Sequence, residues 1–148
     1  MNIEKIYIDS FGKFEGFELD LSSDFNVIYG NNEDGKSTLM AFVRMMFYGD
    51  TSRSRNNIRE KLRDLYRPWH SDRMGGSINF RAGGKRYQLD RSFGKTNSSD
   101  KIKITNLDTG AEIPLMRNQE PGQIFFDLGL EAFEKSVFIG QNGSLISG

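Results

Sequence analysis

Two glycines separated by four residues, followed at once by a lysine and two hydroxyl residues, are the residues of this chain best suited to chemistry. Gly30 and Gly35 allow backbone conformations in which successive N–H groups point inward around an anion. Lys36 then supplies a positive charge, and the hydroxyl of Ser37 is suited to ligate a divalent cation. Gly30–Ser37 satisfies the pattern G-x-x-x-x-G-K-[ST], known as Walker A, which binds the phosphates of a nucleotide.

The residues around this pattern provide the setting that it requires. Phe25–Tyr29 is a short, mostly apolar run that predicts a buried strand, and Lys36–Tyr48 has the spacing of an amphipathic helix that Gly49 ends. A helix that begins at Lys36 directs its N-terminal N–H groups and the positive end of its dipole at the same anion. The sequence therefore predicts ATP and Mg²⁺ as cofactors, with Ser37 on the metal. The predicted nucleotide-binding residues are Gly30, Asn31, Asn32, Gly35, Lys36, Ser37 and Thr38.

The apolar stripe of the predicted helix consists of Leu39, Phe42, Val43, Met46 and Phe47. Alternating and apolar runs predict strands at Ile3–Asp9 and Phe14–Leu21, joined by a turn at Ser10–Lys13, and a last strand at Val137–Ile139. Two further hairpins are predicted, with strands at Ser77–Arg81, Arg86–Phe93, Lys101–Thr105 and Glu112–Leu115. A helical turn is expected within Ile58–Leu65, and a short helix from Pro121 to about Lys135. The fold class is α/β: a P-loop NTPase lobe with a central sheet, a Walker A helix and an added antiparallel β layer.

Composition places the chain among ordinary globular proteins. It has 148 residues, 36% of them apolar and 27% charged, so we expect a single domain over residues 1–148. There are no cysteines, which excludes disulfide scaffolds and thiolate zinc sites. No apolar run approaches the roughly 20 residues of a membrane helix, and Met1–Asp9 does not have the pattern of a signal peptide. These features predict a cytoplasmic protein with no membrane partner.

The net charge of zero hides a basic middle segment. Between Ser52 and Lys103 the sequence has 14 Lys and Arg residues against 5 Asp and Glu residues, a balance of +9. Such a segment suits either a surface that contacts duplex DNA or a solvated face. The densest part is Arg53–Arg67, which is therefore the predicted DNA contact. The two hairpins could extend it with Lys85, Arg86, Lys101 and Lys103.

The chain resembles the ABC-type ATPase heads of the SMC, RecF and RecN group, and within it the YhaN-like ATPases and the double-strand-break repair heads with coiled-coil arms. The resemblance is carried by Ser10–Phe14, Asn26–Gly30, Tyr66–Trp69 and Val137–Gln141. It implies that Gln141 belongs to the Q-loop and contacts the magnesium and the attacking water, which makes it the catalytic candidate and a second metal contact. It also implies that Lys13 touches the nucleotide. The implied activity is ATP hydrolysis in DNA repair or chromosome maintenance.

The resemblance also implies parts that are absent from these residues. The Walker B pair, the signature motif and the switch histidine of that group lie in a C-terminal lobe beyond a coiled coil. Ile124–Asp127 imitates Walker B, but Leu128 stands where the catalytic glutamate belongs, and Leu145–Gly148 imitates the signature motif by chance. We therefore expect a lobe truncated before the coiled coil. It would need its own C-terminal lobe and a second head in an ATP-dependent dimer, and would be inactive alone.

Two other functions fit parts of the pattern. A complete small P-loop kinase or GTPase would need an acidic magnesium partner, for which Asp90 and Asp127 are the candidates. A DNA-binding module with a vestigial P-loop is the other, although intact Lys36 and Ser37 argue against decay. Trp69 is either packed or placed to stack on the base of a nucleotide.

Overall fold

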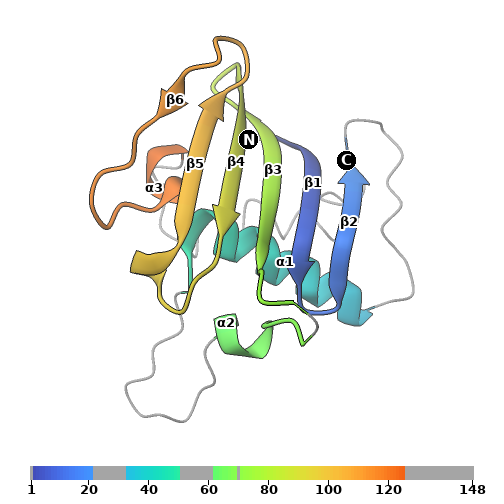
Figure 1. Cartoon of the computed structure of the whole chain (residues 1–148). Coiled ribbons are helices and arrows are strands. Elements are labelled where there is room, and N and C mark those ends of the chain that lie inside the picture. Colours follow the sequence, from blue (N-terminus) through green and yellow to red (C-terminus); the bar gives the residue numbers. More distant parts are fainter. Residues whose placement is uncertain (1, 22–32, 51–61, 70, 126–148) are drawn as a thin grey trace.

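The computed structural model of the chain describes residues 2–21, 33–50, 62–69 and 71–125. Its main feature is one six-stranded antiparallel sheet in the order β2-β1-β3-β4-β5-β6 (Figure 1). The strands are β1 (Asn2–Phe11), β2 (Phe14–Asp20), β3 (Gly75–Ala82), β4 (Lys85–Ser92), β5 (Lys101–Asn106) and β6 (Glu112–Ile113). The helices are α1 (Glu33–Tyr48), α2 (Leu62–Leu65) and α3 (Pro121–Phe125), with a short 3₁₀ turn at Asn97–Ser99.

Tight turns set the register of the sheet. Gly83 and Gly84 connect β3 to β4 with φ angles of 59° and 79°, which are the left-handed values that a two-residue hairpin turn needs. The β1–β2 turn places Gly12 at a φ of 59° directly before Lys13. Both hairpins after residue 75 and the β1–β2 hairpin agree with the sequence patterns. Each register puts apolar side chains on one face, with Ile6 opposite Ile78 and Ile78 opposite Leu89.

The helix α1 covers that apolar face and forms the core with it. It crosses behind the sheet in Figure 1, and all five residues of its predicted stripe are buried. Phe42 meets Phe11 edge-on at 5.3 Å between ring centroids, and Phe47 meets Phe80 at 5.1 Å. Gly76 makes this contact possible, because a Cβ there would lie 2.9 Å from Cζ of Phe42.

The structure corrects the expected layering. In the described residues the two hairpins after residue 75 join β1 and β2 in one continuous antiparallel sheet, so they are not a layer separate from the first hairpin. β1 pairs directly with β3, and the buried side chains of Ile6 and Ile8 continue the apolar face of the β3–β4 hairpin. The expected strands at Phe25–Tyr29 and Val137–Ile139 lie outside the described residues.

The helix boundaries follow the sequence closely. α1 begins at Glu33, three residues before the expected start, and ends at Tyr48, where Gly49 adopts a φ of 70°. α2 lies within the expected helical turn, and α3 begins at Pro121 as expected. Gly122 of α3 packs on the ring of Tyr48, and burial raises the pKa of this phenol above its ordinary value. Among the described residues, no helix has the length and apolarity needed to cross a bilayer.

Candidate nucleotide site and its supports

The first turns of α1 hold the described part of the Walker A pattern. Gly35, Lys36, Ser37 and Thr38 all lie in this helix. Ser37 is exposed to solvent, whereas Thr38 is buried. The hydroxyl of Ser37, the fifth residue of α1, is therefore accessible near the N-terminal end of the helix. Such an end suits an anion with an attached cation.

The β1–β2 turn lies directly against these first turns. A Cβ on Gly12 would lie 3.1 Å from Cγ2 of Thr38 and 3.3 Å from Cδ1 of Tyr66. The backbone N–H of Gly12 donates to the carbonyl O of Tyr66 at 2.7 Å, and the ring of Tyr66 stacks on Phe11 at 5.0 Å. The structure thus brings Lys13, the residue after Gly12, to the end of α1 that carries Ser37. A contact between Lys13 and a nucleotide stays a prediction.

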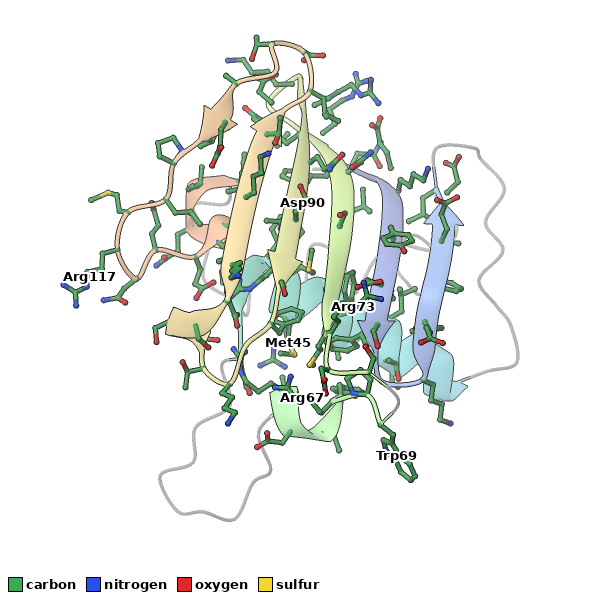
Figure 2. The ribbon with its side chains drawn as sticks, viewed as in Figure 1. Met45, Arg67, Trp69, Arg73, Asp90 and Arg117 are labelled. Atoms are coloured by element: carbon green, nitrogen blue, oxygen red, sulfur yellow. The ribbon has the colours of Figure 1, made fainter. Side chains whose placement is uncertain are left out.

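Trp69 is not packed. Its side chain is 99% exposed and projects away from the sheet (Figure 2), so the packing alternative for this residue is wrong. The residues before it are fixed, because Pro68 is buried and Nη2 of Arg67 donates to the carbonyl O of Gly94 at 3.1 Å. Stacking of Trp69 on a base stays a prediction.

Several predicted site residues lie outside the described residues. These are Gly30, Asn31, Asn32 and Gln141, together with Asp127, the second acidic candidate of the kinase or GTPase alternative. Their roles stay predictions. For Lys36, the structure describes the helical backbone and not the side chain.

A group of buried charges lies at the opposite end of α1. This group, called the buried ion cluster below, consists of Asp50, Arg63, Arg91, Asp100 and Glu120. Asp100 is at its centre: its carboxylate receives Nη1 of Arg63 at 2.7 Å and Nη2 of Arg91 at 2.8 Å. The side chains of Asp100 and Arg91 have no exposed surface, and that of Arg63 is 2% exposed.

The sequence did not predict the buried ion cluster. One of its members, Arg63, lies within the predicted DNA contact Arg53–Arg67. Arg63 is buried and paired, so it cannot serve as a phosphate contact, and Arg67 is tied to Gly94. Arg53, Arg55, Arg59 and Lys61 lie outside the described residues. A signal for Arg91 was present: strand alternation puts it on the same face as the buried Leu89.

The face of the sheet away from α1 is polar. Across the strands, the register aligns Glu18, Tyr7, Ser77, Asp90 and Lys103 in one row on this open face. A hollow of about 490 Å³ lies over this row, and Arg73 and Lys101 are among its lining residues. Asp90 points into the open face (Figure 2) and accepts hydrogen bonds from Ser77 and Gln88.

The position of Asp90 removes it as a magnesium partner for Ser37. Asp90 lies on the open face, whereas α1 lies behind the opposite face (Figures 1 and 2). The kinase or GTPase alternative thereby loses the one of its two acidic candidates that the structure describes.

Comparison with known proteins gives the family. A family model described as an AAA domain matches residues 5–143. The chain is 23% identical over 144 residues to the DNA replication and repair protein RecF of Xanthomonas euvesicatoria pv. vesicatoria (strain 85-10), which covers 88% of the chain and 39% of that protein. It is 42% identical over 50 residues to the uncharacterized protein YhaN of Bacillus subtilis (strain 168), which covers 33% of the chain and 5% of that protein.

The chain therefore spans much less than two thirds of either relative. The family model, in contrast, covers nearly all of the chain, including the Walker A pattern at the start of α1 and the hairpins of the sheet. These matches also agree with the resemblance carried by Ser10–Phe14 and Asn26–Gly30. The chain belongs to this AAA domain family, and its similarity to RecF and YhaN supports an assignment to the SMC/RecF-like heads.

Proposed function

We propose that the chain is the nucleotide-binding lobe of a larger ATPase that acts in DNA repair or chromosome maintenance. The observation that carries this proposal is that the Walker A pattern coincides with the start of α1, a helix of 16 residues packed on the sheet. The loop between β1 and β2 lies against the same end of this helix. A helix N-terminus of this kind is suited to phosphate.

The residues of the site have distinct roles in this proposal. Lys36 places its ammonium on the β- and γ-phosphates, and the backbone N–H groups of Gly30–Gly35 surround them. The Ser37 hydroxyl ligates Mg²⁺, whose positive charge offsets that of the phosphates. Its exposure at the start of α1 fits this role. Gln141 approaches the γ-phosphate from the Q-loop, and Lys13 reaches the nucleotide from the β1–β2 turn.

The lobe is half of a catalytic site in this proposal. Walker B and the signature motif come from a C-terminal lobe and from a second head, so the nucleotide also acts as the switch for dimerisation.

The isolated chain is expected to bind Mg–ATP and to hydrolyse it no faster than background. The reason is that the P-loop and Gln141 only position the phosphates and the water, whereas in this proposal the acidic Walker B residues that complete the metal site and activate the water belong to the C-terminal lobe. Phosphate release is measured with the wild-type chain and with Lys36→Ala as the control for contaminating ATPases. Hydrolysis that is fast in the wild type and absent in Lys36→Ala would contradict the half-site.

Duplex DNA is a second candidate ligand, and two lysines favour it. Lys101 and Lys103 of β5 are exposed on the open face and form no ion pair within the described part of the chain. The nearby acids are engaged elsewhere: Asp9 pairs with Arg73 at 3.6 Å, and Asp90 with Ser77 and Gln88. The two lysines are thus suited to sequence-independent phosphate contacts.

The double variant Lys101→Gln/Lys103→Gln is expected to reduce the salt dependence of duplex binding. Each lost phosphate contact lowers the slope of log K against log salt by about 0.9. Fluorescence anisotropy with a labelled duplex measures this slope. The control is Lys5→Gln/Arg81→Gln, which removes two cations paired with Glu18 and Glu4. Absence of DNA binding by the wild-type chain at about 50 mM salt, where phosphate contacts are strong, would mean that the two lysines are only part of a solvated surface.

A further inference from the structure

The C-terminal end of α1 is held by a guanidinium from another element. Nη1 of Arg91, on β4, donates to the carbonyl O of Met46 at 3.2 Å. Met46 lies in the last turn of α1, where carbonyl groups lack helical partners and carry the negative end of the helix dipole. The last turn of α1 contains no basic residue of its own. Arg91 therefore supplies the cation that this helix end lacks.

Two carboxylates fix the orientation of Arg91. Its Nε and Nη2 donate to Oδ2 of Asp100 at 3.0 and 2.8 Å, and Nη1 also donates to Oε1 of Glu120 at 2.7 Å. Asp100 is fixed in turn, because Oδ1 accepts the backbone N–H of Gly94 at 2.7 Å. A buried guanidinium held on two sides by carboxylates cannot turn away from the Met46 carbonyl without leaving charges unpaired.

We infer that Arg91 is a positioning residue for the nucleotide site. This inference rests on the proposed function. α1 is a single helix of 16 residues, about 24 Å long at 1.5 Å per residue. A packed helix moves as a body, so the group that fixes its C-terminal end also fixes the position of Gly35–Thr38 at the other end. Hydrogen bonds to phosphate need donor–acceptor distances of about 2.7–3.2 Å, so a helix displaced by roughly 1 Å loses them.

Arg63 provides a matched control. It is as deeply buried as Arg91 and shares the same carboxylate, with Nη1 at 2.7 Å from Oδ1 of Asp100. Its other hydrogen bonds go to Gly94, Asn97 and Asp50, and none reaches α1 within the described residues. A purely structural role in the buried ion cluster would make the two arginines equivalent. Only Arg91 donates to a carbonyl of α1 itself, so a positioning role through this helix end predicts the larger effect on nucleotide binding for Arg91.

The test compares Arg91→Lys with Arg63→Lys in the full 148-residue chain. Both variants are expected to lose stability in urea, because one ammonium cannot replace a guanidinium that makes several directed bonds. Mg–ATP affinity is then measured by titration under conditions where each variant is folded. We expect Arg91→Lys to bind Mg–ATP at least tenfold more weakly, and Arg63→Lys to stay within twofold of the wild type.

The outcomes separate the inference from the proposed function. Equal affinities of the two variants for Mg–ATP, or equal losses in both, would overturn the positioning role while the proposed function stands. Absence of Mg–ATP binding by the wild-type chain would overturn the proposed function itself, and the inference with it.

If Arg91→Lys does not fold, a measurement on the wild-type chain tests the positioning role of Arg91 instead. Coupling between two sites is reciprocal. If the contact between Arg91 and the Met46 carbonyl favours nucleotide binding, nucleotide binding must therefore stabilise that contact. The amide of Gly49 donates to Met45 O at 2.8 Å, next to the carbonyl that Arg91 contacts. Its hydrogen exchange should be about tenfold slower with Mg–ATP bound. The amide of Gly110, in the β5–β6 turn, should not change. Unchanged exchange at Gly49 in the nucleotide-bound protein would overturn the inference.

Discussion

Replacing Asp100 by alanine is expected to lower the free energy of unfolding by about 3–5 kcal/mol, the typical cost of removing one partner from a buried ion pair. The substitution leaves the guanidinium groups of Arg63 and Arg91 without their shared carboxylate, in a site where the side chain of Asp100 has no exposed surface. It also leaves the N–H of Gly94 without its acceptor. Urea unfolding followed by circular dichroism measures the change.

Asp108→Ala is the control for this substitution. Asp108 is exposed and accepts one backbone N–H, that of Arg86, at 3.3 Å. Its loss is expected to change the free energy of unfolding by about 0.5 kcal/mol or less, as for most surface substitutions. Equal effects of the two substitutions would show that the buried ion cluster contributes no special stability.

Replacing Lys36 by alanine is expected to abolish the stabilisation of the chain by Mg–ATP. A ligand at 100 times its dissociation constant stabilises the folded state by about 2.7 kcal/mol, which raises Tm by roughly 5 to 10 °C for a chain of this size. Lys36→Ala removes the charge that faces the phosphates, so the shift should disappear. Differential scanning fluorimetry with and without nucleotide measures it.

The unliganded Tm of Lys36→Ala is its internal control. Lysine and alanine are both good helix formers, so the substitution is expected to change the stability of α1 by only a few tenths of a kcal/mol. A full nucleotide-induced shift in Lys36→Ala would place the ligand outside the Walker A pattern.

Local patterns predicted most of the secondary structure. The Gly83-Gly84 turn between two alternating runs predicted the β3–β4 hairpin, because only such residues adopt left-handed φ angles without strain. The apolar spacing from Leu39 to Phe47 predicted the buried face of α1. The stripe did not include Met45, which is buried because the far side of the last turn of α1 is also covered.

Contacts between distant segments were not predictable in the same way. The joining of β1 to β3 depends on which strand edges meet, and the spacing of apolar residues is the same whether the sheet is one or two. The buried ion cluster brings Arg63 to Asp100, 37 residues away, and Arg91 to the carbonyl of Met46, 45 residues away. A count of charges therefore treated Arg63 as part of a basic surface, although its charge is balanced inside the fold.

Of the candidate site, the sequence predicted the helix that carries Lys36 and Ser37, and the structure adds the support behind it. Gly12 lies against Thr38 because the turn before Lys13 has no side chain to hold the two apart. That proximity comes from packing and has no signature in the spacing of residues.

The proposal that the chain is a nucleotide-binding lobe is tested most directly by titrating the wild-type chain with Mg–ATP in a calorimeter. We expect saturable binding with one nucleotide per chain, weakened when Mg²⁺ is removed because Ser37 then has no cation to ligate at the phosphates. Absence of binding by the folded chain at millimolar Mg–ATP, a concentration that corresponds to a binding free energy of only about −4.1 kcal/mol, would contradict it.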